Sequence, residues 1–119
     1  MTPSLVIGLD IGTSGCKGVA VDRRGRIAAA ASGSYRLYSP RVGWAEQDVN
    51  EVWRAAAGAL AKVVGQVARG RIDGVCLSGA MHSLVPVDAH GTVRMRWAAA
   101  STGRCSTIAQ ARKRARRRW

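Results

Sequence analysis

The residue types best suited to chemistry lie near the N-terminus, within Leu5–Asp22. Asp10 comes at the end of a short apolar run, and the turn that follows it combines glycines with two hydroxyl side chains. Backbone N–H groups and hydroxyls of such a turn can hold phosphate oxygens, and Mg²⁺ prefers one or two carboxylates together with phosphate oxygens. The stretch therefore predicts a site for the phosphates and the metal of a nucleotide. The candidate residues are Asp10, which is also the candidate metal ligand, Gly12, Thr13, Ser14 and Lys17.

The same stretch also has a purely structural interpretation. Its glycines can simply turn the chain, because glycine accepts positive φ, and Asp10 can end a strand. The spacing matches neither GxGxxG nor GxxxxGK[ST], and short glycine motifs occur in many contexts. From these residues alone, both interpretations stay open.

A second candidate site follows the short apolar run Ile72–Leu77. Met81 and His82 lie in the polar turn after this predicted strand, in the place where open α/β sheets bind their ligands. Methionine is polarisable and can line a small pocket. A lone histidine is more often structural than functional, so that alternative also stays open. Trp44–Asp48 is interpreted as a loop that leads into a helix cap.

The elements that must position these residues begin with three strands. The runs Leu5–Leu9, Lys17–Asp22 and Ile27–Tyr35 are apolar or rich in alanine, and short turns that contain glycine separate them. Strands joined by such turns form hairpins. The three runs are therefore predicted to form an antiparallel meander.

A helix and a returning strand are predicted next. Asp48 as N-cap with Glu51 three residues later is a capping-box pattern, and apolar residues then recur in steps of three and four over residues 49–67. The helix should run for about five turns, at 3.6 residues a turn, and end at Gly70. Because the helix returns the chain to the sheet, Ile72–Leu77 should lie parallel to an earlier strand.

A small hairpin is predicted after this strand, with brief strands at 84–87 and 92–95 around a turn at 88–91. The order of elements is three strands, helix, strand and hairpin, which is an α/β arrangement.

Length and composition indicate one compact domain. The chain has 119 residues, of which 47% are hydrophobic, and none of its apolar runs is long enough to span a membrane. The N-terminus lacks the pattern of a signal peptide, which predicts a cytoplasmic protein without a membrane partner. The cysteines are odd in number and form no CxxC pair, so free thiols are expected at Cys16, Cys76 and Cys105.

The formal net charge of +12 is unevenly distributed along the chain. Residues 1–93 contain ten Lys and Arg against seven Asp and Glu, whereas residues 94–119 contain nine Lys and Arg and no acid. One hypothesis is a small basic protein that binds nucleic acid through its Arg-rich tail, with strong salt dependence. The alternative is a solvated, disordered tail, which is the usual state of a charge block. Nothing in the sequence indicates an oligomeric state.

Three stretches taken together are much more specific than any one of them. They are Gly8–Lys17, Gly43–Asp48 and Leu77–Asp88. In order and spacing, across residues 4–95, they resemble the N-terminus of the FGGY family of carbohydrate kinases. Within that family, Ala80–Ser83 looks more like the gluconate kinases and Ser14–Lys17 more like the xylulose kinases, with the gluconate class preferred.

The resemblance implies a ribonuclease-H-like domain of the actin/hexokinase/Hsp70 type. It implies transfer of the γ-phosphoryl of ATP to a hydroxyl of a sugar or sugar acid, with Mg²⁺ as the metal. In that case Asp10 helps to hold the Mg²⁺ of ATP, and Lys17 lies near the phosphates. The first phosphate loop would be formed by Gly12, Thr13 and Ser14, and the sugar pocket would be lined by Met81 and His82.

The chain also departs from the family pattern. The general-base Asp, the second phosphate loop and the adenosine pocket of the family would lie further downstream, so this chain alone is expected to be inactive. Family resemblance and acidic residues are lost together near residues 94–100, which suggests a truncation or a frameshift. We therefore expect an incomplete domain over residues 1–96 and a basic, disordered or frame-shifted tail over 97–119. An uncovered helix and sheet edge would make the isolated chain poorly soluble or partly unfolded.

Overall fold

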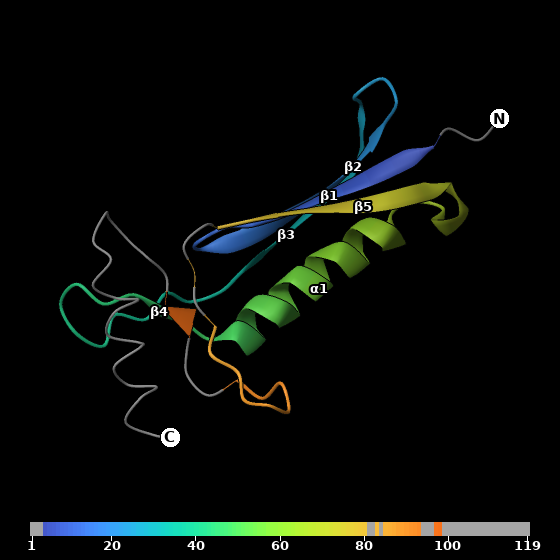
Figure 1. The fold of residues 1–119 in the computed structure, drawn as a ribbon. Coiled ribbons are helices and arrows are strands. Elements are labelled where there is room, and N and C mark those ends of the chain that lie inside the picture. The colour runs from blue at the N-terminus through green and yellow to red at the C-terminus, as the bar shows by residue number, and fades with distance from the viewer. Residues whose placement is uncertain (1–3, 81–82, 84, 94–96, 99–119) are drawn as a thin grey trace. The chain divides into compact units, whose positions relative to one another are not determined.

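The computed structural model describes residues 4–80, 83, 85–93 and 97–98 (Figure 1). The contacts divide the chain into two units. The first unit is Met1–Tyr35 with Val52–Ala80, and the second is Arg36–Glu51 with Met81–Trp119.

The first unit contains a four-stranded sheet with the order β3-β2-β1-β5. Its strands are β1 (Leu5–Ile11), β2 (Gly15–Asp22), β3 (Ile27–Ser34) and β5 (Ile72–Gly79). β1 and β2 pair antiparallel, as do β2 and β3, whereas β1 and β5 pair parallel. The predicted meander and the predicted parallel return strand are therefore both confirmed. β1 and β5 each run two residues further than predicted, so Asp10 lies within a strand rather than at its end.

Helix α1 (Val49–Gly65) begins where the sequence predicts and ends earlier. Asp48 Oδ1 accepts a hydrogen bond from the backbone N of Asn50 at 2.8 Å, as an N-cap does. At the other end, the Gln66 side chain donates to the carbonyl oxygen of Lys62 at 3.0 Å. This bond satisfies one of the carbonyls that a helix end leaves unpaired. The backbone N atoms of Gln66 and Val67 donate instead to carbonyl oxygens three residues earlier, at 3.2 and 3.4 Å, so the α-helical pattern ends before Gly70. A short 3₁₀ helix, η1 (Arg69–Arg71), which was not predicted, follows it.

The predicted capping box is only half formed. Glu51, its expected second member, accepts hydrogen bonds from the Tyr38 hydroxyl at 2.6 Å and from the backbone N of Arg36 at 3.3 Å. The hydrogen bond from Tyr38, and then the one from Arg36, lower the pKa of Glu51. Glu51 thus fastens the preceding loop to the start of α1. Among the described helices, none is long and apolar enough to cross a membrane.

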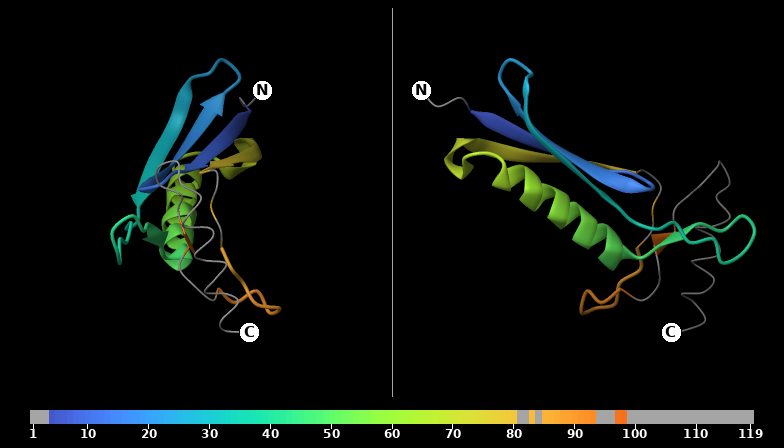
Figure 2. Two further views of the ribbon diagram at one scale, coloured as in Figure 1. Left: turned by 60° about the vertical axis from the view of Figure 1, so that its left-hand side comes forward. Right: turned by 180° about the vertical axis from the view of Figure 1, so that it is seen from behind.

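From Val52 onward, α1 lies along one face of the sheet, as the two views of Figure 2 agree. The core between them is built from small and aliphatic residues: Ile7, Ala20, Ala29 and Val63. Small residues let the helix approach closely. A Cβ placed on Gly33 of β3 would lie only 2.9 Å from the carbonyl oxygen of Ala55 in α1. Glycine at this position therefore sets the distance between strand and helix.

Strand β5 is an edge of this sheet among the described residues, and its apolar side chains are not covered. Val75 and Leu77 pair with Ile7 and Leu9 of β1, so they share the helix-facing side of the sheet. Yet Val75 is 51% and Leu77 is 67% exposed. Trp53 of α1 is exposed as well. These side chains are the physical basis for the low solubility that we predict.

The second unit contains a two-stranded sheet of β4 (Glu46–Gln47) and β6 (Trp97–Ala98), paired antiparallel. β4 lies inside the stretch predicted as a loop, and β6 lies at the first two residues of the predicted tail. The predicted turn at 88–91 is present, with the backbone N of Gly91 donating to the carbonyl oxygen of Asp88 at 3.0 Å. In the described part of the predicted hairpin, the strand pairing is reduced to one isolated bridge between Val87 and Val93.

Candidate phosphate-binding site

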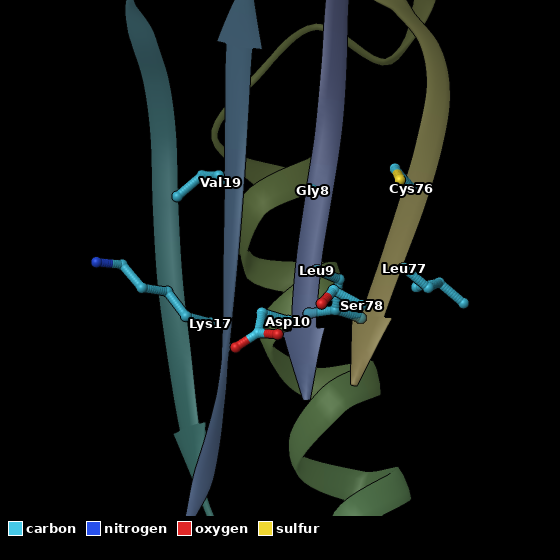
Figure 3. Close-up of a pocket in the computed structure, with 8 residues that line it drawn as sticks. All are labelled: Gly8, Leu9, Asp10, Lys17, Val19, Cys76, Leu77 and Ser78. Atoms are coloured by element: carbon cyan, nitrogen blue, oxygen red, sulfur yellow. The ribbon is translucent and has the colours of Figure 1, made fainter. Parts of the chain in front are cut away.

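Alternation along β1 separates the core from the candidate site. Leu5, Ile7 and Leu9 are buried on the side of α1, and Asp10 points to the opposite face and is exposed. The register pairs Asp10 with Lys17 of β2 on one side and with Ser78 of β5 on the other. The three polar side chains therefore form a row across the open face, near the carboxyl ends of two parallel strands (Figure 3). Two of these three residues were predicted, and Ser78 was not.

Asp10 and Lys17 are neighbours but do not neutralise each other. In the described part of the chain no ion pair joins them, and the Lys17 amine extends away from the Asp10 carboxylate (Figure 3). Both side chains are exposed. The row therefore presents a carboxylate suited to a cation and, separately, an ammonium suited to an anion.

The turn between β1 and β2 is compact. The backbone N of Gly12 donates to the carbonyl oxygen of Gly15 at 2.9 Å, and Thr13 and Ser14 are exposed at its tip. Positive φ, one expected reason for its glycines, is not used. The glycines with φ of +77° among the described residues are instead Gly25, Gly43 and Gly91. Another property of glycine must explain this turn.

Close packing explains the glycine at position 15. A Cβ placed on Gly15 would lie 2.6 Å from the carbonyl oxygen of Gly33, which is closer than such atoms can approach. Gly33 is in turn held against Ala55 of α1. The end of the turn is thus fixed to β3 and, through β3, to the helix.

Tyr35 is a second residue of this site, besides Ser78, that the sequence did not reveal. Its hydroxyl lies 2.5 Å from the carbonyl oxygen of Gly12 and 2.9 Å from that of Gly15. Its backbone N donates to the carbonyl oxygen of Ser14 at 3.4 Å. The side chain is buried, and burial raises the pKa of Tyr35, with smaller contributions from Cys16 and Asp10. A single tyrosine after an alanine-rich strand carries no sequence signal of this contact.

A shallow, open hollow of about 290 Å³ lies beside the row of polar residues. It is lined by Gly8, Leu9, Asp10, Lys17, Val19, Cys76, Leu77 and Ser78. A Cβ on Gly8 would meet Val19 Cγ2 at 3.8 Å, so the missing side chain leaves room between the strands. Cys76 is an exposed free thiol at the hollow, and Cys16 is a buried one. Because well-formed ligand pockets are deeper than this, the hollow alone does not enclose a ligand.

The donor set fits a magnesium-bound phosphate. One exposed carboxylate, Asp10, is paired in register with Ser78 and with Lys17, which supplies a positive charge, and the turn after β1 carries two further hydroxyls. Magnesium takes few protein ligands and fills its shell with water and phosphate oxygens. Met81 and His82, the predicted sugar-pocket residues, and Cys105 lie outside the described residues.

Comparison with known proteins agrees with this geometry. The model of the "FGGY family of carbohydrate kinases, N-terminal domain" matches residues 5–118. The match extends beyond residue 96, where the sequence places the end of the domain. A xylulose kinase of Staphylococcus epidermidis is 34% identical over 93 residues, which are 76% of this chain and 19% of that protein. A gluconokinase of Bacillus subtilis is 34% identical over 85 residues, which are 71% of this chain and 17% of that protein.

The structural comparison leads to the same family. The crystal structure of xylulose kinase from Rhodospirillum rubrum superposes with a TM-score of 0.78 at 33% identity, covering 92% of this chain and 23% of that one. The predicted fold class is thereby confirmed. This chain spans about a fifth of the length of the relatives it matches. With a matching fold and a family model that covers almost all of its residues, the chain belongs to the FGGY family of carbohydrate kinases.

Proposed function

We propose that this chain supplies the first phosphate-binding turn of an ATP-dependent carbohydrate kinase. The observation that carries the proposal is the placement of Asp10. Its exposed carboxylate stands next to Lys17 and Ser78, two residues before the tightly held turn that begins at Gly12. This arrangement can bind Mg²⁺ and phosphate oxygens side by side, and phosphoryl transfer depends mainly on such positioning.

Each group in the proposal has a separate part. Asp10 holds the Mg²⁺ of ATP, directly or through water, and the turn of Gly12, Thr13 and Ser14 receives phosphate oxygens. Lys17 lies near the phosphates and offsets their charge. ATP supplies the phosphoryl group when it is bound. None of the candidate residues is a general base for the sugar hydroxyl, so the complete reaction would need residues beyond this sequence.

The acceptor in this proposal is a sugar or a sugar acid. Support comes from relatives that are named xylulose kinase and gluconokinase and match with equal identity. Met81 and His82 would line the sugar pocket, and Ala80–Ser83 favours the gluconate class by resemblance. Residues 97–119 are proposed to form a basic tail that takes no part in this site.

The experiment that tests the proposal is MgATP binding by wild-type chain and by Asp10→Asn. Because the Asp10 side chain is exposed, its loss leaves the core intact. We expect weak MgATP binding by the wild type and binding about tenfold weaker or worse in the variant, the loss typical of a carboxylate that orients a bound metal. Without Mg²⁺ the variant should bind ATP at least as well as the wild type, because the carboxylate that repels the phosphates is gone. Isothermal titration calorimetry or an NMR titration measures both constants.

The matched control is Asp22→Asn, which changes a carboxylate at the far end of the same strand pair. Its MgATP affinity should equal that of the wild type. A wild-type chain that does not bind MgATP, or an Asp10→Asn chain that binds it equally well, would contradict the proposal.

A further inference from the structure

We infer that Tyr35 is the positioning residue of the phosphate-binding turn: through its hydroxyl and its backbone it holds three carbonyl groups of the turn away from the ligand. The inference rests on the proposed function, because Tyr35 is proposed to shape the same turn that is proposed to bind phosphate. Tyr35 does not touch the ligand itself. It acts through the peptide groups of Gly12, Ser14 and Gly15.

The contacts of Tyr35 reach both ends and the middle of the turn. The hydroxyl lies within hydrogen-bond distance of the Gly12 and Gly15 carbonyl oxygens, and the backbone N donates to that of Ser14. A phenol has one hydrogen, so the hydroxyl shares it between its two acceptors. One residue thus accounts for three of the carbonyls between Gly12 and Gly15.

These contacts matter because a peptide group has two ends of opposite polarity. In a trans peptide the C=O and the next N–H point in opposite directions. Since the Gly12 carbonyl points to Tyr35, the Thr13 N–H points away from Tyr35. N–H groups attract phosphate oxygens, and carbonyl oxygens repel them. Tyr35 therefore selects the orientation of this peptide that favours an anion.

The turn needs such an anchor because its own sequence does not restrict it. Glycine populates more backbone conformations than other residues, so a peptide beside Gly12 can rotate at low cost. Tyr35 is itself well fixed: it is 8% exposed and follows β3, whose Gly33 packs against Ala55. A tyrosine hydroxyl is protonated at neutral pH, and burial raises the pKa of Tyr35 further, so the hydroxyl stays a donor into the alkaline range.

The chain provides a matched control for this contact. It has two tyrosines, and the hydroxyl of the other, Tyr38, donates to Glu51 rather than to the turn. Tyr35→Phe and Tyr38→Phe each remove one hydroxyl and nothing else. We expect MgATP affinity to fall about three- to tenfold in Tyr35→Phe, the usual effect of one buried hydrogen bond. Tyr38→Phe should bind MgATP as the wild type does.

Backbone hydrogen exchange tests the anchor independently of nucleotide. In Tyr35→Phe the amides of residues 12–16 should exchange several-fold faster than in the wild type, while the amides of β1 before residue 11 keep their protection. Wild-type chain that fails to bind MgATP would overturn the proposed function, and the exchange data would still decide the anchoring. Unchanged exchange or unchanged MgATP affinity in Tyr35→Phe would overturn this inference alone.

A second measurement covers the case in which Tyr35→Phe does not fold. Fluorotyrosine introduced into the Tyr38→Phe background labels Tyr35 alone and lowers the pKa of its phenol without removing the hydroxyl. MgATP affinity should then fall at the pH at which the fluorine NMR signal of Tyr35 reports ionisation, and the unlabelled protein should show no change there. Affinity that stays constant through this ionisation would overturn the inference.

Discussion

The two turns of the meander join neighbouring strands but are held by side chains from different places, one from within the turn and one from far along the chain. The β2–β3 turn holds itself: Asp22 Oδ1 accepts hydrogen bonds from the backbone N of Arg24 at 2.9 Å and of Arg26 at 3.0 Å. Its Gly25 has φ of +77° and meets nothing within 4 Å. The β1–β2 turn has an internal backbone hydrogen bond, from Gly12 to Gly15. It is also held by the side chain of Tyr35, which lies 20 residues or more along the chain, and Gly15 packs against Gly33.

The difference explains why only one of the two turns suits a ligand. Asp22 is occupied by its own turn and by an ion pair with Arg26 at 2.8 Å. In the described part of the chain, Asp10 makes no hydrogen bond or ion pair through its carboxylate. A turn anchored from outside leaves its nearby carboxylate to bind something else. This is the arrangement that a metal-phosphate site requires.

The largest difference between the two turns should appear when one glycine in each is replaced by alanine and the free energy of unfolding is measured. Gly15→Ala places its Cβ 2.6 Å from a backbone oxygen, which cannot move aside as a flexible side chain can. We expect a loss of about 3 kcal/mol in the free energy of unfolding, at the upper end for overpacking. Gly25→Ala meets no atom and carries only the strain of positive φ, about 1 kcal/mol. Denaturant unfolding of the two variants measures both.

MgATP binding by the same two variants separates stability from site geometry. Gly25→Ala should bind as the wild type does, and Gly15→Ala should bind more weakly because its turn must shift. If the two variants lose equal stability, or if Gly25→Ala also loses affinity, the distinction between an internally and an externally held turn is wrong.

Raising the pH into the alkaline range should have a moderate effect on stability through Tyr35, which holds the β1–β2 turn. Burial raises the pKa of Tyr35 above its usual value of 10.0, so the folded chain retains this proton more strongly than the unfolded chain. The stabilisation is complete below about pH 10 and is lost as the pH rises through the pKa of the folded state. Above that pH, the melting temperature should fall more steeply with rising pH in the wild type than in Tyr35→Phe. Parallel slopes would show that the hydroxyl is not held in the turn.

Lowering the pH should have the smallest effect on stability, and it should act through Asp22 of the β2–β3 turn. Hydrogen bonds, first from the backbone N of Arg26, hold the pKa of Asp22 below its usual value of 3.8. A lowered pKa contributes stability above that value, and this stability is lost as the pH falls through the pKa of the folded state. Asp22→Asn should therefore flatten the stability profile slightly below about pH 4. A variant with an unchanged acid profile would show that the β2–β3 turn does not depend on this carboxylate.

Much of the fold could be predicted from local pattern. The alternation of β1, the capping residue Asp48 and the spacing of apolar residues in α1 each report on a few neighbouring residues. The end of α1 was predicted too late because the backbone hydrogen bonds tighten to three-residue steps at Gln66 and Val67, a change that the apolar spacing, which continues to Val67, does not report. The edge residues Val75 and Leu77 are exposed although they belong to an apolar run. Apolar character predicts burial whether or not a partner covers the strand.

The residues of the candidate site also fall into two groups, those that a local motif suggests and those that only strand pairing brings to the site. Asp10, Gly12, Thr13, Ser14 and Lys17 are close in sequence, so a short motif is enough to suggest them. Ser78 joins them only through the parallel pairing of β1 with β5, and Tyr35 only through the return of β3. Met81 and His82 stay predictions.

By itself, the sequence determined the four strands of the larger sheet, the helix, the family and the polar residues of the turn, since each depends on neighbours or on short motifs. Only the tertiary structure decided that Gly15 serves close packing rather than positive φ, and that Tyr35 anchors the turn. The physical reason is distance along the chain. Hydrogen bonds and steric contacts between residues 20 or more apart leave no periodicity in the sequence, and they exist only once the strands are paired.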